Sequence, residues 1–199
     1  MSDLAVDICK VGKLMFDRHL TDIAGGNISA IEGDTLYITP RYAGLKYHWN
    51  LKPEQILAGP YRTDELFTHP LFSREGLSHV AIYRTFPEAK AVIHAHPANI
   101  LPFVSDNIPL PPVLKGTQKY GVLEYHDEAP AYSQEQADAI VRKLQNQRNR
   151  IREVAAAVLM PRHGIIIAAK DLYAAIDTLE RSNTNAWCII TQKILRISA

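Results

Sequence analysis

The sequence has few cysteines, no long hydrophobic run and almost no net charge. Its cysteines, Cys9 and Cys188, lie far apart inside predicted helices, which argues against a disulfide framework and favours a reducing compartment. No stretch approaches the ~20 consecutive apolar residues of a membrane-spanning helix. The N-terminus "MSDLAVDICK" also lacks the basic region of a signal peptide. We therefore expect a cytoplasmic protein without a membrane partner.

The charges of the chain nearly cancel, because 22 lysines and arginines stand against 21 aspartates and glutamates. Such a balance disfavours binding to nucleic acids and other polyanions. A chain of 199 residues can bury roughly 70% of its unfolded surface, so it needs no disulfide or metal merely to fold. No repeat, linker or low-complexity segment interrupts it, and we expect one domain over residues 1–199.

Apolar periodicity predicts interleaved helices and strands, which is the pattern of a layered α/β domain. Helices are predicted over residues 2–20, 73–87, 133–147 and 171–197, the third opening with a Ser-x-x-Gln capping box. Strands are predicted over residues 34–40, 91–96 and 121–125, and on both sides of the turn at 161–164.

A pair of histidines lies at the end of one predicted strand. The stretch "KAVIHAHPAN" places His94 and His96 one residue apart, just before Pro97. Because strand side chains alternate between faces, both imidazoles point the same way. A buried histidine is often only a hydrogen-bonded core residue, but two converging ring nitrogens at a strand end also indicate a metal site. The motif alone does not distinguish these interpretations.

Two further residues have chemistry suited to such a site. His163 lies in the turn "PRHG", where it is either an exposed turn residue or a third metal ligand. Three neutral imidazoles leave one position of a tetrahedral divalent cation open, as in catalytic sites. Glu75 begins the helix that leads into the His94 strand, and its carboxylate either complements the helix dipole or reaches the metal. Spacing alone leaves both alternatives open.

Several motifs extend this pattern along nearly the whole chain. The segments "AGGNIS", "LYITP", "SREGLSH", "VIHAHP" and "RHGIIIAAKDLYAA" follow in an order and spacing that resembles the class II aldolase/adducin family over about residues 5–195. Its best known members are L-fuculose-1-phosphate and L-rhamnulose-1-phosphate aldolases. The resemblance implies a three-layer α/β/α fold with a central, largely antiparallel sheet, and a homo-oligomer, expected to be a tetramer, with active sites between subunits.

The same resemblance implies roles for individual residues. The three histidines match the family's metal ligands, and the expected cofactor is Zn²⁺, with Mn²⁺ or Fe²⁺ as alternatives. Glu75 matches a carboxylate that binds the metal at rest and acts as acid or base once substrate displaces it. Asn27, with the backbone of Gly25 and Gly26, matches the loop that holds substrate oxygens.

The chain departs from the sugar-phosphate aldolases where those enzymes bind phosphate. The segments "TPRYAG" and "SREGLSH" carry Arg41 and Arg74 where the family usually has hydroxyl residues, while Ser73 is retained. The tyrosine that assists protonation in the aldolases is missing near "PPVLKG". A guanidinium can hold a planar carboxylate through two parallel hydrogen bonds. The two arginines are therefore either a rebuilt anion site or solvated surface charges.

Together these features predict a metal-dependent carbon–carbon lyase that acts on a small hydroxy or oxo substrate through an enediolate or enolate. Aldol cleavage and decarboxylation are the main expectations, and a dehydratase of the same family, such as the methylthioribulose-phosphate type, is a further one. The alternative of another class is a non-catalytic adducin-like binding domain. That alternative predicts lost metal ligands, whereas this chain retains the histidines and Glu75.

Overall fold

Helices and strands alternate along the chain, and the computed structural model describes residues 3–197. The strands are β1 (Asn27–Glu32), β2 (Thr35–Ile38), β3 (Leu57–Pro60), β4 (Ala91–Ala95), β5 (Ala155–Met160) and β6 (Gly164–Ala169). The α-helices are α1 (Asp3–Asp17), α2 (Ala43–Tyr47), α3 (Gly76–Thr85), α4 (Leu101–Ser105), α5 (Gln134–Gln145), α6 (Arg148–Glu153) and α7 (Leu172–Ile197). Short 3₁₀ helices are η1 (Pro53–Gln55), η2 (Glu65–Thr68) and η3 (Lys115–Tyr120).

The strands form one six-stranded sheet in the order β3-β2-β1-β4-β6-β5. Each neighbouring pair is antiparallel. Strand β4 lies between β1 and β6, so that Asn27 is opposite His94 on one side and Ile166 is opposite His94 on the other. Segments that are far apart in the sequence are thereby brought to the end of β4.

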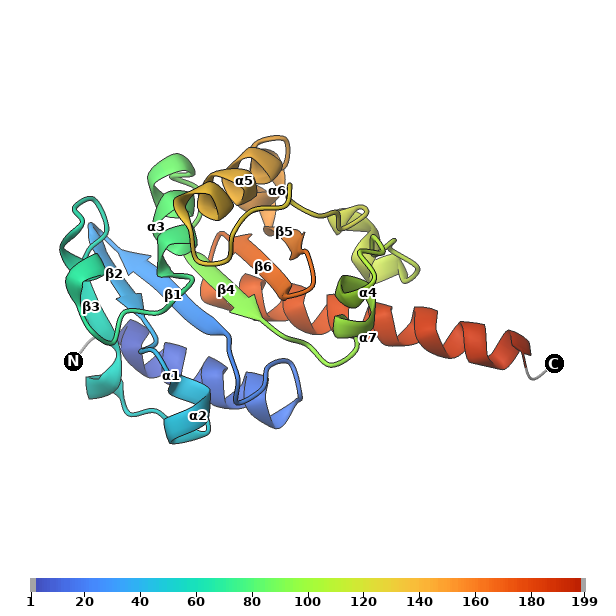
Figure 1. Ribbon diagram of the computed structural model, residues 1–199, viewed down its shortest axis with the longest axis horizontal. Helices are drawn as coiled ribbons and strands as arrows, with labels where there is room; N and C mark the ends of the chain where they lie inside the picture. The colour runs from blue at the N-terminus through green and yellow to red at the C-terminus, as the bar shows by residue number, and fades with distance from the viewer. Residues whose placement is uncertain (1–2, 198–199) are drawn as a thin grey trace.

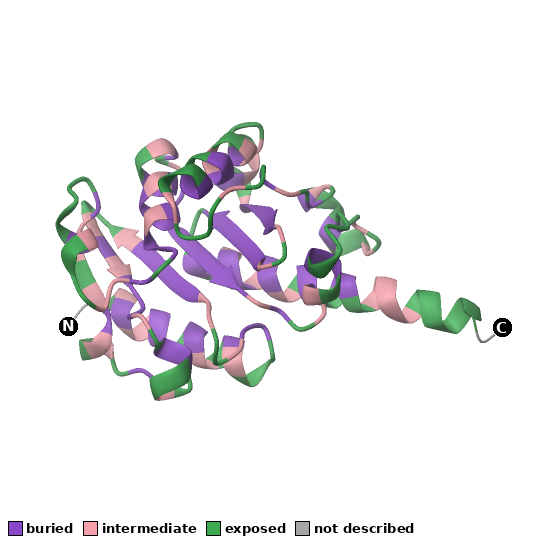
Figure 2. Cartoon of the chain, in the orientation of Figure 1, coloured by how far each residue is buried: buried purple, intermediate pink, exposed green. Residues whose placement is uncertain are grey.

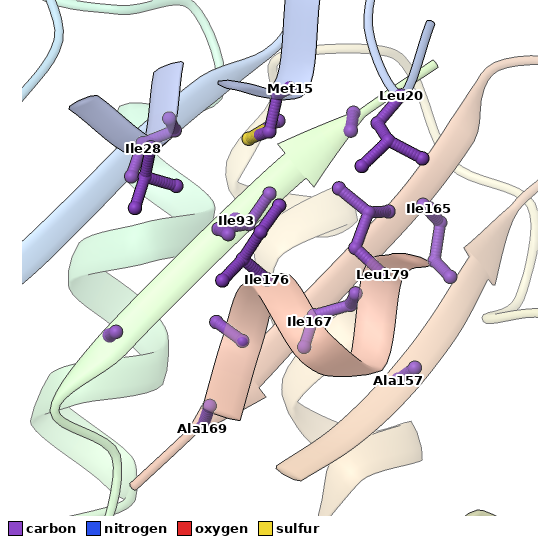
Figure 3. Close-up of a cluster of buried hydrophobic side chains, with 14 of the residues drawn as sticks. Met15, Leu20, Ile28, Ile93, Ala157, Ile165, Ile167, Ala169, Ile176 and Leu179 are labelled. Atoms are coloured by element: carbon purple, nitrogen blue, oxygen red, sulfur yellow. The ribbon is translucent and has the colours of Figure 1, made fainter. Parts of the chain in front are cut away.

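Helices cover both faces of the sheet. Helices α1 and α7 pack on one face, and α3, α5 and α6 lie on the other (Figure 1). Alternate strand residues divide between the two cores: Ile93 packs in the α1 and α7 core, whereas Val92 packs on the α3 side. Figure 3 shows Met15 of α1 and Ile176 of α7 beside Ile93, and Figure 2 shows that the central strands are buried. The expected three-layer fold is confirmed.

Two expectations about local structure are corrected. Asn27, expected in a loop, is the first residue of β1, because polar and apolar side chains alternate from that point as a strand requires. Residues 121–125, expected to form a strand, make only the isolated bridges Leu110–Leu123 and Tyr125–Leu159. These bridges join two different segments, so no continuous ladder forms there.

The helices bear on two expectations from the sequence: that the cysteines form no disulfide and that no helix spans a membrane. Cys9 in α1 is a buried free thiol, and Cys188 in α7 is a free thiol that is only partly buried. Within residues 3–197, no helix combines the length and the apolar character that crossing a membrane requires.

Candidate metal and substrate site

Three imidazoles converge at the end of β4. His94 belongs to β4, His96 follows its last residue, and His163 lies in the turn between β5 and β6. Their ring centres lie 4.7 to 5.1 Å apart, and one ligand nitrogen from each falls within 4.8 Å of the others. The antiparallel pairing of β4 with β6 places this turn beside the strand end. The sequence-predicted histidines are therefore brought together.

Hydrogen bonds orient two of these rings. The Nδ1 atom of His94 lies 3.1 Å from the carbonyl oxygen of Ile165. Because a carbonyl only accepts, Nδ1 donates there and Nε2 keeps its lone pair. The Nδ1 atom of His96 lies 3.3 Å from the Asp22 carboxylate, and its Nε2 atom is buried without a hydrogen-bond partner. In both residues a neighbouring oxygen lies close to Nδ1 and leaves Nε2 available, which is the arrangement of histidines that bind a metal ion.

The environment keeps the imidazoles of His94 and His163 neutral. Burial lowers the pKa of His163 to about 4, and the neighbouring His96 imidazole acts in the same direction. Burial also lowers the pKa of His94 well below its usual value, again with the other imidazoles contributing. Neutral imidazole is the form that binds a metal ion, so the state of these two residues suits a divalent cation near neutral pH.

Glu75 lies beside His163, one of the three histidines. It is the residue that precedes helix α3, and only 1% of it is exposed. Its Oε1 atom lies 3.7 Å from Nδ1 of His163 and has no hydrogen-bond partner, while Ser78 donates a hydrogen bond to Oε2 at 3.3 Å. Burial raises the pKa of Glu75 to about 7, against the smaller opposing effect of Ser78. The carboxyl group can therefore hold or release a proton near neutral pH.

Asp22 organises the loop that precedes β1. Its Oδ1 atom accepts the backbone N–H groups of Ala24 and Gly25, at 2.9 and 3.0 Å, and contacts Nδ1 of His96. Its carbonyl oxygen accepts a hydrogen bond from the indole of Trp49. One residue thus connects the glycine loop to a histidine of the cluster. No sequence motif identified Asp22, because its partner His96 lies 74 residues away.

The glycines of this loop lie against the cluster. A Cβ atom on Gly25 would lie 2.3 Å from Cε1 of His96, so the imidazole occupies space that any other residue would fill. Gly26 has a φ of +93°, a conformation that glycine adopts without strain. The next residue, Asn27, is buried, and its side-chain oxygen has no hydrogen-bond partner. The start of β1 therefore presents an unsatisfied polar atom opposite His94, the cross-strand neighbour of Asn27.

A cavity of about 300 Å³ brings the predicted residues together. Its walls contain every residue that the sequence indicated: Gly25, Gly26, Asn27, Arg41, Ser73, Arg74, Glu75, His94, His96 and His163. The hydroxyl of Ser73 already donates to the carbonyl oxygen of Thr39 at 2.7 Å, so it fixes the wall and does not point a free proton into the cavity.

Two tyrosines that the sequence analysis missed complete the walls. Tyr42 and Tyr132 line the cavity, and both have left-handed backbone conformations, with φ of 69° and 64°. Bulky residues rarely adopt such a conformation, and the strain is typical of functional sites. The backbone N–H of Tyr132 donates to the Gln136 side chain. The predicted capping box is therefore half formed: Ser133 caps the helix as expected, but Gln136 holds Tyr132.

A second, smaller cavity of about 220 Å³ lies on the other side of His163 and Tyr132. The buried His126 lines it, with Nδ1 2.6 Å from the carbonyl oxygen of Asp127 and Nε2 without a partner. Burial lowers the pKa of His126. Sequence reasoning gave no signal for this residue, which lies outside the motifs quoted above.

Comparisons with known proteins extend over almost the whole chain. Residues 6–189 match the model of the class II aldolase and adducin N-terminal domain. An L-fuculose phosphate aldolase of Methanocaldococcus jannaschii is 25% identical over 178 residues, which cover 86% of this chain and 88% of the relative. A 3-oxo-tetronate 4-phosphate decarboxylase of Haemophilus influenzae is 24% identical over 196 residues, covering 96% and 90%.

Solved structures share the fold. The L-fuculose-1-phosphate aldolase of Thermus thermophilus superimposes with a TM-score of 0.81 at 20% identity, over 98% of this chain and 97% of that structure. A sugar-phosphate aldolase of Thermotoga maritima gives a TM-score of 0.75 at 19% identity, over 99% and 97%. At these identities the likeness concerns the arrangement of the backbone.

Proposed function

The chain belongs to the class II aldolase and adducin family, and we propose that it is a metal-dependent carbon–carbon lyase acting on a small hydroxy or oxo substrate. The observation that carries this proposal is the juxtaposition at the end of β4. Three imidazoles converge there, and a buried carboxyl group with a pKa of about 7 lies beside one of them, His163. Such chemistry requires a metal ion with an open coordination position, and an acid or base whose pKa lies near neutral pH.

The three histidines would hold one divalent cation, with Glu75 as a further ligand before substrate arrives. Imidazole sets of this kind suit Zn²⁺, and Mn²⁺ or Fe²⁺ are the alternatives. When bound, the cation supplies Lewis-acid stabilisation of negative charge on a carbonyl-derived oxygen, worth several kcal/mol.

Glu75 is the proposed acid or base. Glu75 lines the cavity, and its Oε1 atom is buried without a hydrogen-bond partner, which suits the carboxyl group to proton exchange with a substrate bound there. The Asn27 amide and the backbone at Gly25 and Gly26 are proposed to hold substrate oxygens. The N–H of Gly25 is already bound to Asp22, which leaves to Gly25 the role of keeping space for His96.

Decarboxylation is the second candidate reaction. It leaves negative charge next to a carbonyl, as aldol cleavage does, and the Haemophilus influenzae relative bears the name of a decarboxylase. The arginines in the cavity wall, Arg41 and Arg74, offer a place for a carboxylate. Release of CO₂ against release of an aldehyde distinguishes the two reactions on any substrate that turns over.

We also propose that the protein works as one domain, in the cytoplasm and as a homo-oligomer, expected to be a tetramer. Free thiols at Cys9 and Cys188 support the reducing compartment. The resemblance to the family supports the assembly.

Metal analysis tests the proposed site. Purified protein loaded with Zn²⁺ and then desalted is expected to retain close to one equivalent, and His94→Ala is expected to lose it. His69→Ala is the matched control, because His69 is exposed and lies outside the cavity. Retention of no metal by the unsubstituted chain would contradict the proposal. Glu75→Gln should keep the metal but lose turnover in a screen of aldehydes, sugar phosphates and hydroxy acids, because an amide cannot exchange the proton.

A further inference from the structure

Two arginines stand in the wall of the cavity without a negative partner. Arg41 follows β2 after Pro40, and Arg74 comes immediately before Glu75. Both line the cavity that contains the three histidines. Neither guanidinium forms an ion pair with a carboxylate of residues 3–197. Two uncompensated positive charges in a partly enclosed cavity favour an anionic ligand.

Pairing is the rule for the other arginines of the described chain. The arginines that form ion pairs with carboxylates are Arg18, Arg62, Arg84, Arg142, Arg148, Arg152, Arg162 and Arg181. Arg150 instead donates to the Tyr120 carbonyl and the Gln147 side chain, and Arg196 lies on the exposed last turns of α7. The unpaired charges of Arg41 and Arg74 are therefore a feature of the cavity, and not of the arginines in general.

Both guanidiniums are held in place by aromatic rings. The Arg41 guanidinium lies 5.1 Å from the centre of the Tyr42 ring, and its Nε atom is buried without a hydrogen-bond partner. The Arg74 guanidinium lies 5.5 Å from the Tyr132 ring centre, and hydrogen bonding to the Tyr132 and Tyr42 phenols raises its pKa. A buried donor without an acceptor costs free energy unless a ligand supplies one.

Four other donors around the cavity are already used. The N–H groups of Ala24 and Gly25 donate to Asp22, the N–H of Arg41 donates to the Leu71 carbonyl, and the Ser73 hydroxyl donates to Thr39. These four donors, which could otherwise bind a phosphate, are thus engaged within the protein. Planar guanidinium groups remain, and these match a planar carboxylate through paired hydrogen bonds.

We propose that the substrate of this enzyme carries a carboxylate, which Arg41 and Arg74 bind while the opposite, oxo or hydroxy end faces the histidines and Glu75. The substrate class is therefore a small hydroxy or oxo acid and not a sugar phosphate. This inference rests on the proposed function, because it identifies the substrate of that same cavity. A cavity of about 300 Å³ is of the size that holds a small molecule.

Calorimetric titration of the zinc-loaded full chain with malonate, and separately with inorganic phosphate, tests the inference. Malonate is expected to bind one saturable site more tightly than phosphate does. Arg41→Gln and Arg74→Gln should each weaken malonate binding about tenfold or more, the scale of one lost charged hydrogen bond. Arg74→Lys keeps the charge but not the planar donor pair, and is expected to restore only part of the affinity.

Arg62→Gln is the matched control, because Arg62 is paired with Asp34 far from the cavity, and it should bind malonate like the unsubstituted chain. Unchanged affinity in both cavity variants, tighter binding of phosphate, or no saturable malonate site would each overturn the inference. Zinc content is measured on the same samples. If the protein keeps its zinc but shows one of these results, only the inference of a carboxylate substrate is refuted. If the protein holds no zinc, the proposed function is refuted.

Discussion

Glu75 has a carboxyl group whose proton affinity changes on folding. In the folded protein its pKa is raised from 4.5 to about 7, chiefly because it is buried. The unfolded chain therefore releases this proton at lower pH than the folded protein does. Between these two values the folded state binds more protons, so the contribution of Glu75 to stability falls as pH rises. The same property that suits Glu75 to proton transfer destabilises the metal-free protein.

We expect the substitution Glu75→Gln to stabilise the metal-free protein increasingly as pH rises from 4.5 to about 7. Above that interval the gain should level off at roughly 3 kcal/mol, because the amide avoids burial of a charge. Urea unfolding of chelator-treated samples across this pH range measures the difference. His163, whose pKa burial lowers to about 4, gives the opposite slope, but it is present in both proteins and cancels.

Glu88→Gln is the contrasting control. The hydrogen bond from Arg148 lowers the pKa of Glu88 to about 2 in the folded protein. The ionised Glu88 therefore stabilises the fold at any pH above its unfolded pKa, and this stabilisation is lost as pH falls towards about 2. Its amide variant should be less stable than the unsubstituted chain at neutral pH. If Glu75→Gln gave no gain at neutral pH, the buried carboxyl would not hold its proton as described.

Among individual residues, the sequence allowed prediction of those that lie in local motifs. Two histidines on one strand face and a third at a strand mouth are visible from spacing, and the motif order implied Glu75. Asp22 and Tyr132 were not predictable, because their roles depend on contacts with His96 and Arg74, which lie far away in the sequence. The left-handed conformation of Tyr132 has no signal in residue type either, since aromatic residues disfavour it.

At the scale of elements, the loop before β1 fits closely against the end of β4. The contact depends on Gly25, whose missing Cβ leaves room for the His96 imidazole. On the other side, a Cβ on Gly164 would lie 2.4 Å from the Ala95 carbonyl and 2.8 Å from Cδ2 of His96. His96 is therefore enclosed by two backbone segments that approach it without side chains of their own.

We expect Gly25→Ala to disturb the position of His96 more than the stability of the fold. The added methyl group would lie 2.3 Å from Cε1 of His96, so the ring must rotate away from the cluster. Zinc affinity, measured by competition with a chelator, should fall about 10–100-fold, the usual consequence of a misoriented ligand. The midpoint of urea unfolding of metal-free protein should change little.

Gly116→Ala is the matched control for this substitution. Its added methyl group would meet only Nη1 of Arg181, at 2.9 Å, which is the end of an exposed and flexible side chain. Zinc affinity should stay unchanged in this variant. Equal affinities in both glycine variants would show that Gly25 does not determine where His96 lies.

Elements with strong periodicity were predicted well, but their pairing was not. The buried runs of β4, β5 and β6 and the long helix α7 were visible as apolar patterns. Strand β1 was missed, because the glycines before it suggest a loop and its first residue, Asn27, is polar. The sheet order, with β4 between β1 and β6, follows from long-range pairing that no local pattern contains. The antiparallel character came only from the family resemblance.

At the scale of the whole molecule, the last turns of α7 extend beyond the sheet (Figure 1). They expose Trp187, Leu195 and Ile197 by 52, 68 and 86%. Exposed apolar groups gathered on one segment are typical of an interface. In the proposed homo-oligomer, we expect a second copy of the chain to cover them.

Light scattering at micromolar concentration should therefore give a multiple of the 22.3 kDa chain mass. Leu195→Glu is expected to lower that mass, because the new carboxylate would be buried between copies. Gln192→Glu adds the same charge at an exposed polar position of the same helix and should leave the mass unchanged. A monomer in the unsubstituted protein would contradict the proposed assembly.

The position of β4 in the sheet also decides when the site forms during folding. The hairpins β1–β2 and β5–β6 join neighbouring segments and can close within microseconds. Strand β4 pairs with residues 27–30 and 165–169. Such non-local pairing is slow, because the entropy of closing a long loop is lost before stabilising contacts form. His94 and His96 lie in β4 and just after it, and His163 lies in the β5–β6 turn, so the three imidazoles come together only once this non-local pairing is complete.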